Sequence, residues 1–317
     1  MNDLFKMIGK RLLSLIVILF GLSVLTFGLT FLLPSDPVEE LINSMGAGHD
    51  AEMIARLEEQ YGTNRGFVEQ YTDWITGVVL RGDFGVSVKY DKPVREVIAT
   101  KLPYTILLAC TSFLTMVIVA FPLGILSAVY KNRIADYIIR FVSFIGVSMP
   151  SFWFGMILIW IFAVRLGWLP VAGSTSWQHI ILPTLTLSLS MICSYTRRIR
   201  AVMVEQLSEE YISGCLARGI RRPRIILTHV LPNSLLAVVT MLGMSFGSLL
   251  GGTMIVETVF SWNGIGLVCT TAITARDYAL IQGYVMWMGC IYVMVNLAVD
   301  VSYSLIDPRI RRGMERK

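Results

Sequence analysis

Charge is scarce in this sequence, and so are the side chains that most often carry enzyme chemistry. Only 15% of the 317 residues are charged, 55% are hydrophobic, and the chain has three His and five Cys. Together with a mean hydropathy of +0.65, this balance excludes an ordinary water-soluble globular protein of this length. The Cys residues show no CxxC spacing, so we interpret them as small packing residues rather than as a zinc site or a disulfide framework.

Enzyme signatures are missing or out of place. The sequence has no GxxxxGK[ST] phosphate-binding loop and no HExxH, the patterns of nucleotide hydrolysis and of a zinc protease. The stretch GMSFG at residues 243–247 matches GxSxG, but it lies in an apolar run rather than in the strand-turn-helix elbow that a serine hydrolase needs. We therefore predict that the chain is not an enzyme.

Long apolar runs are what the sequence does contain. About 20 apolar helical residues span a hydrocarbon core of about 30 Å. The first run is too long for a signal peptide and has no small-residue cleavage site after it. We predict an all-α polytopic membrane protein with six transmembrane helices, at about residues 8–33, 104–129, 138–165, 180–198, 235–256 and 280–306.

Basic residues predict the orientation, because cytoplasmic segments carry an excess of Lys and Arg. With the N-terminus inside, 18 of the 27 Lys and Arg lie on the inner side, and seven of the other nine lie in one long outer segment. We expect both termini to be cytoplasmic. The predicted parts are residues 1–33 (N-terminus and first span), 34–103 (outer insert), 104–306 (five-helix core, with a cytoplasmic loop at 199–234) and 307–317 (tail).

The outer insert, residues 34–103, holds twelve acidic residues against seven basic ones. We predict a small helical cap with amphipathic helices in DAEMIARLEEQYG (50–62) and FVEQYTDWITGVVL (67–80), and a further helix in PVREVIATKL that begins at Pro93.

Several polar or helix-breaking residues lie within the apolar runs. Ser148 and Pro150 in GVSMPSFW predict a kink, which either lines a pathway or only suits packing. Asp300 is either an ion ligand or a hydrogen-bonding residue near the cytoplasmic mouth. Gly243, Gly247 and Gly251 recur four apart, which predicts a close helix contact.

The most polar connector is SEEYISGCLARGIRRPRIILTHVLPN, residues 208–233. Ser208 predicts an N-cap, and Glu209 and Glu210 are acids in a first turn. The helix then runs to about Arg218 and ends at Gly219 in a left-handed conformation, after which Pro223 opens the next helix. A helix of about ten residues is only roughly 15 Å long, so we expect it to lie on the cytoplasmic surface.

The spacing in this connector resembles a loop of known permeases. From Ser213 the order is SGC, three residues, Gly219, nine residues, then His229, Val230, Leu231 and Pro232. This is similar to the EAA-xxx-G-x9-I-x-LP loop of permease subunits in binding-protein-dependent ABC importers. Here the EAA triplet is replaced by Ser213 to Cys215, and the Ile position is occupied by His229.

The resemblance continues along about 300 residues and is strongest to the dipeptide, oligopeptide and nickel branch. Asn263 stands where relatives commonly have Pro, which predicts a less rigid outer loop. The matching stretches are KRLLSLIVILFGLSVLTF, RGDFGVSV, KPVREVI, FPLGI, GVSMPSFW, WLPVAG, WQHIILPTLTL, GGTMIVETVFSWNGIG, RDYALIQ and DPRIRR.

The resemblance implies a type I ABC permease fold in a prokaryotic cytoplasmic membrane, surrounded by lipid. The implied partners are a second homologous permease, two ATPase subunits that use ATP and Mg²⁺, and an extracytoplasmic solute-binding protein; no cofactor on this chain and no nucleic acid are implied. The short helix would insert into an ATPase groove, and the pathway candidates are Ser148, Pro150, Glu257, Asn263 and Asp300. The implied contact residues are Glu209, Glu210, Tyr211, Ile212, Cys215, Leu216, Arg218 and Gly219.

The cargo is the least determined feature. WQHIILP and GWLPVAG are most similar to permeases for nickel or a nickel chelate, while dipeptide and oligopeptide importers share the scaffold. His179 in that segment is a possible metal ligand or a polar interface anchor. An ion-coupled secondary transporter is the alternative from another class, but it would show internal repeats and several intramembrane acids.

Overall fold

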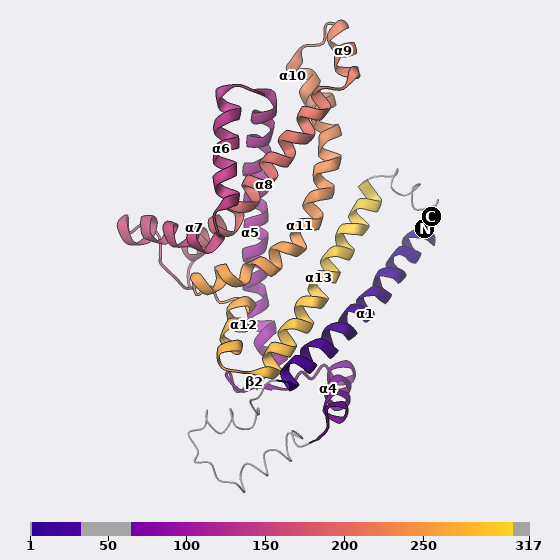
Figure 1. Cartoon of the computed structure of the whole chain (residues 1–317), viewed down its shortest axis with the longest axis vertical. Coiled ribbons are helices and arrows are strands. Elements are labelled where there is room, and N and C mark those ends of the chain that lie inside the picture. The colour runs from indigo at the N-terminus through magenta and orange to yellow at the C-terminus, as the bar shows by residue number, and fades with distance from the viewer. Residues whose placement is uncertain (1, 33–64, 307–317) are drawn as a thin grey trace. The chain divides into compact units, whose positions relative to one another are not determined.

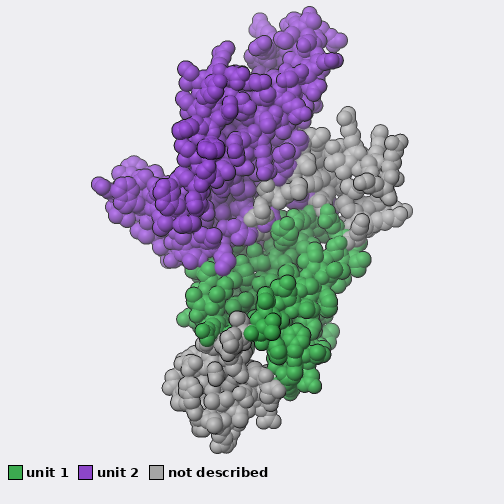
Figure 2. Space-filling view, viewed as in Figure 1, with its two compact units in different colours: residues 1–105, 263–297 green, residues 106–262, 298–317 purple. Residues whose placement is uncertain are grey.

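The structure, a computed structural model, describes residues 2–32 and 65–306. The helix predicted at 50–62 and the tail at 307–317 lie outside the described residues. The chain divides into two compact units, residues 1–105 with 263–297 and residues 106–262 with 298–317 (Figure 2). We refer to them as unit 1 and unit 2.

The predicted all-α architecture is confirmed, and each predicted span coincides with a long helix or with a bent helix pair (Figure 1). Within the described residues, four helices are long and apolar enough to cross a membrane, and the bent pair would make a fifth. The long helices are α1 (Asn2–Phe31), α5 (Val94–Val129), α8 (Ile181–Leu207), α11 (Leu231–Val259) and α13 (Tyr278–Ile306).

Unit 1 contains the described part of the outer insert. The predicted helix at 67–80 is confirmed as α4 (Phe67–Arg81), and it packs on α1 through Phe27, whose ring centroid lies 5.6 Å from those of Phe67 and Tyr71. The buried hydroxyl of Ser23 also bonds to the Tyr71 hydroxyl at 2.8 Å. The amphipathic face of α4 therefore packs against the first span of the same chain.

The insert is not purely helical, contrary to prediction. β1 (Val86–Ser87) and β2 (Lys92–Pro93) form a short antiparallel pair, and the third predicted helix is continuous with the following span, since α5 begins at Val94. Fully buried Asp277 stabilises this turn, because its Oδ2 accepts bonds from the Ser87 hydroxyl (2.5 Å) and the Lys89 N–H (3.1 Å). A two-residue ladder has no periodicity that sequence patterning could reveal.

A buried apolar cluster joins the start of α5 to α12 (Ile265–Thr274) and to the start of α13. Its fully buried members include Val94, Ile98, Ile265 and Leu280. These three helix segments of unit 1 therefore share one core.

In unit 2 the predicted kink at Pro150 is a complete break. Helix α6 (Ile134–Ser148) ends, Met149 is extended with ψ 132°, and α7 (Ser151–Leu158) leaves at 105° to α6 (Figure 1). Pro150 lacks an N–H and disfavours the α conformation at the preceding residue, so two residues leave the helix together. The kinked span predicted over 138–165 is therefore a bent pair of helices rather than one kinked helix. A π-helix (Ile159–Arg165) and a 3-10 helix (Trp177–Ile180) lead from α7 to α8.

Two glycines that the sequence did not single out allow close helix packing in unit 2. A Cβ at Gly124 of α5 would stand 2.7 Å from Ile199 of α8, and one at Gly146 of α6 would collide with Cys193. At Gly251 an added Cβ meets nothing within 4 Å, so the described part of this chain makes no close approach there. The i, i+4 spacing finds small residues, but it cannot tell which face meets a neighbour.

Candidate functional site

The connector forms a short helix between α8 and α11. Helix α9 spans Glu210–Ala217, but the predicted N-cap at Ser208 is wrong. Ser208 has helical backbone angles and caps the C-terminus of α8, and its hydroxyl donates back to the Val204 carbonyl at 2.9 Å. Glu209, which is extended with ψ 148°, takes the N-cap position of α9 without a side-chain cap bond. A serine hydroxyl can bond backward as well as forward, and the sequence does not decide between these.

The predicted end of α9 at Gly219 is confirmed. Gly219 has φ +74°, its N–H donates to the Leu216 carbonyl at 2.9 Å, and the Ile220 N–H donates to the Cys215 carbonyl at 3.1 Å. These are the two bonds of a Schellman motif, in which the left-handed residue is usually glycine. The sequence signal was sufficient because few residues other than glycine adopt this backbone readily.

Beyond the cap the chain turns back into the bundle. Pro223 lies in the first turn of α10 (Arg222–Ile225), as predicted. A five-residue π-helix (Ile226–Val230) then leads directly into α11. The polar connector is therefore α9 and α10 joined by the Gly219 turn.

The two faces of α9 have different surroundings. Ile212 and Cys215 pack with Ile220 against the core of unit 2, and the Tyr211 hydroxyl donates to Gln206 Oε1 at 3.2 Å. Half of the apolar face expected to meet a partner is thus turned toward its own chain. The exposed residues are Glu209, Glu210, Ser213, Gly214, Leu216, Ala217 and Arg218.

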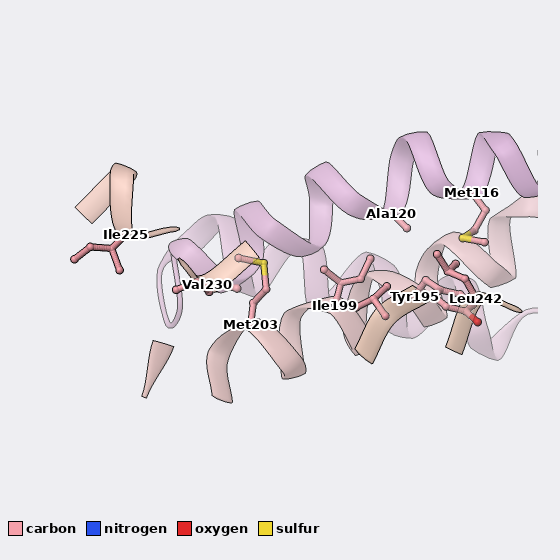
Figure 3. Packing of buried hydrophobic residues seen from close by; sticks show 10 residues of the cluster. Met116, Ala120, Tyr195, Ile199, Met203, Ile225, Val230 and Leu242 are labelled. Atoms are coloured by element: carbon pink, nitrogen blue, oxygen red, sulfur yellow. The ribbon is translucent and has the colours of Figure 1, made fainter. Parts of the chain in front are cut away.

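A continuous apolar core connects the connector with the long helices (Figure 3). Ile225 of α10 is 2% exposed. Val230 of the π-helix and Met203 of α8 are fully buried in the same cluster. Further along α8, the Tyr195 hydroxyl donates to the Met241 carbonyl of α11 at 2.7 Å. The connector is therefore packed into the same core as α8 and α11, and close-packed interiors transmit strain.

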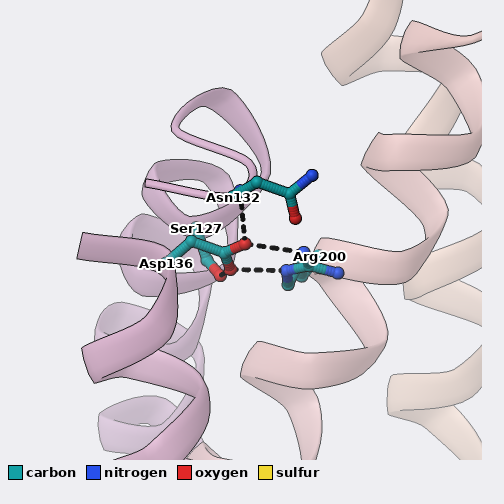
Figure 4. A network of polar contacts seen from close by, with 4 residues as sticks. All are labelled: Ser127, Asn132, Asp136 and Arg200. Carbon is teal, nitrogen blue, oxygen red and sulfur yellow. Dashed lines mark hydrogen bonds and ion pairs between the residues drawn. The ribbon is translucent and has the colours of Figure 1, made fainter. Parts of the chain in front are cut away.

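A buried ion pair adds α6 to this assembly (Figure 4). Asp136, which is fully buried, accepts two bonds from the Arg200 guanidinium of α8 at 2.6 and 2.7 Å. The Ser127 hydroxyl of α5 and the Asn132 N–H complete its partners at 2.6 and 2.9 Å. Sequence reasoning missed Asp136 and treated Arg200 only as an orientation signal, although a lone acid within KNRIADYIIR is the kind of residue that pairs with a nearby base.

The other predicted site residues are distributed over both units. In unit 2, Ser148 is exposed and its hydroxyl bonds to the Phe144 carbonyl at 2.9 Å; Pro150 is exposed at the helix break, and Glu257 is fully buried in α11. Asp300 lies in α13, and its side chain is outside the described residues.

Asn263 in unit 1 accepts a hydrogen bond from the Lys101 ammonium. Two residues on, the Ile265 N–H donates to Thr105 Oγ1 at 2.9 Å. The loop that has Asn in place of the usual Pro is therefore bonded to α5 at two points.

His179 has a local structural role. Its Nδ1 lies 2.8 Å from the Ser176 hydroxyl and accepts from the Ser176 N–H at 3.2 Å, which caps the 3-10 helix. Across the residues described, no group of three or more His, Cys, Asp or Glu side chains is placed to hold a metal ion.

Comparisons with known proteins show the family to which the chain is similar. Residues 120–312 match the family described as binding-protein-dependent transport system inner membrane component, and residues 4–109 match the N-terminal region of such membrane components. The permease protein GsiC of the glutathione transport system from Escherichia coli K12 is 40% identical over 302 residues, which cover 95% of this chain and 97% of that protein. The corresponding protein of Shigella flexneri serotype 5b has the same identity and coverage.

A solved structure shares the fold. The inward-facing MetNI methionine ABC transporter aligns with a TM-score of 0.53 at 15% identity, over 67% of this chain and 97% of that one. The family matches together cover most of the sequence, and the apolar helices are those of a multi-pass membrane protein. This chain therefore belongs to the inner membrane components of binding-protein-dependent transport systems, as a permease subunit of an ABC importer.

Proposed function

We propose that this permease forms half of the translocation path for a short peptide of the glutathione type. The supporting observation is the 40% identity to a glutathione transport permease over nearly the full length of both chains. The dipeptide and oligopeptide alternative from the sequence fits this better than nickel or a metal chelate. The nickel expectation depended on WQHIILP and GWLPVAG, and His179 in the first of these stretches caps a 3-10 helix.

Uptake by the complete transporter in a strain that lacks other peptide importers tests the cargo. We expect labelled glutathione or a dipeptide to accumulate, and a nickel chelate to remain at the level of the strain without the permease. A matched strain in which the ATPase subunits lack their phosphate-loop Lys should accumulate none of the three. Accumulation of the nickel chelate alone would refute the peptide assignment.

The proposed mechanism needs a second permease, two ATPase subunits that use ATP and Mg²⁺, and an extracytoplasmic binding protein. ATPase closure would move α9, and the core around Met203 and Ile225 would pass that movement to α8 and α11. Such coupling of a local contact to a two-state bundle is a common form of switching. On this chain, the docking face would be the exposed residues one turn apart, namely Glu210, Ser213, Gly214 and Ala217.

Gly214 offers a sharp test of that docking face. A Cβ at Gly214 would meet nothing within 4 Å in this chain, so Gly214→Trp should leave the permease folded while blocking an ATPase groove. We expect loss of ATPase binding and of uptake at unchanged permease abundance. Gly214→Ala is the control and should transport normally, since Ala favours helix over Gly by about 1 kcal/mol. Normal uptake by the Trp variant would contradict docking through this face.

A further inference from the structure

An open pocket of about 510 Å³ lies between α6 and α8, at the end of unit 2 that carries the connector. Its lining consists of three arginines and three aromatic residues with no acidic side chain, namely Tyr137, Arg140, Phe141, Phe144, Arg197 and Arg200. The peptide path and the ATPase contact leave this pocket without a role.

Among the described residues, no acidic side chain neutralises the whole charge of the pocket. Both oxygens of the Asp136 carboxylate, which bonds to Arg200 of the pocket, are occupied by Arg200, Ser127 and Asn132. In the part of the chain that the structure describes, no ion pair joins an acid to Arg140 or Arg197. Two guanidiniums therefore contribute a charge of about +2 to one cavity at neutral pH.

These two guanidiniums lie farther than the ion pair from the end of α6 and α8 that is near the connector. Arg140 follows Asp136 by four residues and Arg197 precedes Arg200 by three, so each is about one helical turn, roughly 5 Å, further from that end of the bundle. Both are exposed, and the Arg140 guanidinium carbon lies 5.8 Å from the centroid of the Tyr137 ring. The ion pair fixes the spacing of α6 and α8, and with it the spacing of the two unpaired arginines.

The pocket lining also includes exposed apolar side chains. Phe141 is 65% exposed and Phe144 is 64% exposed. They lie on α6, which together with the segment Ser151–Arg165 forms a bent pair whose combined length and composition suit a membrane. Long basic side chains near the ends of membrane helices extend toward the head-group layer. Basic pockets between membrane helices suit acidic lipid head groups. A ligand here needs one phosphate for the arginines and acyl chains for the aromatic face.

We propose that this pocket binds the phosphate of an anionic phospholipid, with Arg140 and Arg197 holding the head group and Phe141 and Phe144 contacting its chains. The site is independent of the cargo. The lipid would contact both α6 and α8. It would therefore link these two helices a second time, in addition to the ion pair of Asp136 and Arg200.

Titration of the assembled transporter with lipid tests the site. The complete complex is stripped of lipid in detergent, phosphatidylglycerol or phosphatidylcholine is added, and bound lipid per permease is counted by native mass spectrometry. We expect preference for phosphatidylglycerol, weakened about fivefold by Arg140→Gln or Arg197→Gln and about 30-fold by both, at ~1 kcal/mol per basic residue near a membrane surface. Inorganic phosphate at equal concentration should not displace the lipid.

Arg133→Gln is the matched control, because Arg133 precedes α6, is exposed and is not part of the pocket lining. It should leave the preference unchanged. Because Arg200 is kept, the double variant should melt at the wild-type temperature in phosphatidylcholine micelles; if it does not fold, the two single variants carry the test.

Three results would overturn the proposal. The first is equal phosphatidylglycerol affinity in the wild type and the arginine variants. The second is displacement by free phosphate, which would make this a simple anion site. The third is a cross-link from Phe144→Cys to the second permease subunit in the resting complex, because a protein would then cover the pocket.

Discussion

The Gly219 turn gives the most direct test of how α9 is held. The backbone at this residue is left-handed, with φ +74°, and an added Cβ would meet nothing within 4 Å. Substitution therefore costs backbone strain without a steric clash. An L-residue in this conformation costs roughly 1–2 kcal/mol relative to glycine, and Asn is tolerated better than Ala or a β-branched residue.

That strain acts on a helix with little stability of its own. Helix α9 has eight residues, far fewer than an isolated helix needs in water. If Gly219→Val changes the turn, the two cap bonds made by Gly219 and Ile220 are lost as well, at about 0.5–1.5 kcal/mol each. Because each 1.4 kcal/mol is a factor of ten in an equilibrium constant, the strain alone lowers the ratio of correctly oriented to misoriented α9 roughly five- to 30-fold.

The assay is the ratio of transported cargo to ATP hydrolysed by the complete transporter in proteoliposomes. We expect Gly219→Val to lower the ratio of cargo to ATP by up to about 30-fold, Gly219→Ala by less, and Gly219→Asn by no more than about threefold, in the order of their left-handed strain. Membrane insertion should be equal in all four proteins. A Val variant with wild-type stoichiometry, or an Asn variant as poor as Val, would refute the role of this turn in orienting α9.

Three further predictions concern the bundle of unit 2. Asp136→Asn should destabilise the permease by about 3–5 kcal/mol, because it leaves the Arg200 guanidinium without its charge partner; thermal unfolding in detergent measures this, and Asp136→Leu combined with Arg200→Met should recover most of the loss. Gly146→Val should prevent normal assembly, since even a Cβ has no room there, while Gly251→Val should leave the isolated permease intact; equal accumulation of both in the membrane would contradict the packing. Pro150→Ala should reduce uptake more than abundance, because it permits helix across the 105° break; equal loss of both would favour a role in packing alone.

Sequence reasoning was successful where one residue type dictates one backbone state. Gly219 and Pro223 were placed correctly because left-handed caps and first helical turns restrict residue choice strongly. The long helices were predicted because a run of about 20 apolar residues is typical of a membrane-spanning helix and of few other structures.

The wrong and the missing structural predictions have a common cause. The conformation or partner of each residue depended on tertiary neighbours that the local sequence does not show. Ser208 could cap either of two adjoining helices, and only the end of α8 decided which. Asp136 drew no prediction, because its partner Arg200 lies 64 residues away in the sequence. Cargo was uncertain for a different reason, since no described site residue shows a chemistry specific to nickel or to a peptide.

The inward face of α9 explains how so short a helix can transmit motion. Ile212 and Cys215 pack against the unit 2 core, so α9 is anchored before any ATPase binds. Ile212→Ala should loosen this anchor at a cost of about 1–2 kcal/mol, less than for a fully buried isoleucine because Ile212 is only partly buried. We expect faster proteolysis of residues 208–222 in the permease without its ATPases, whereas Gly214→Trp should show wild-type proteolysis there and differ only in the complex. If both variants are cleaved at the wild-type rate, α9 is held by its partner rather than by its own chain, and the transmission of motion through the core around Met203 and Ile225 would have to be abandoned.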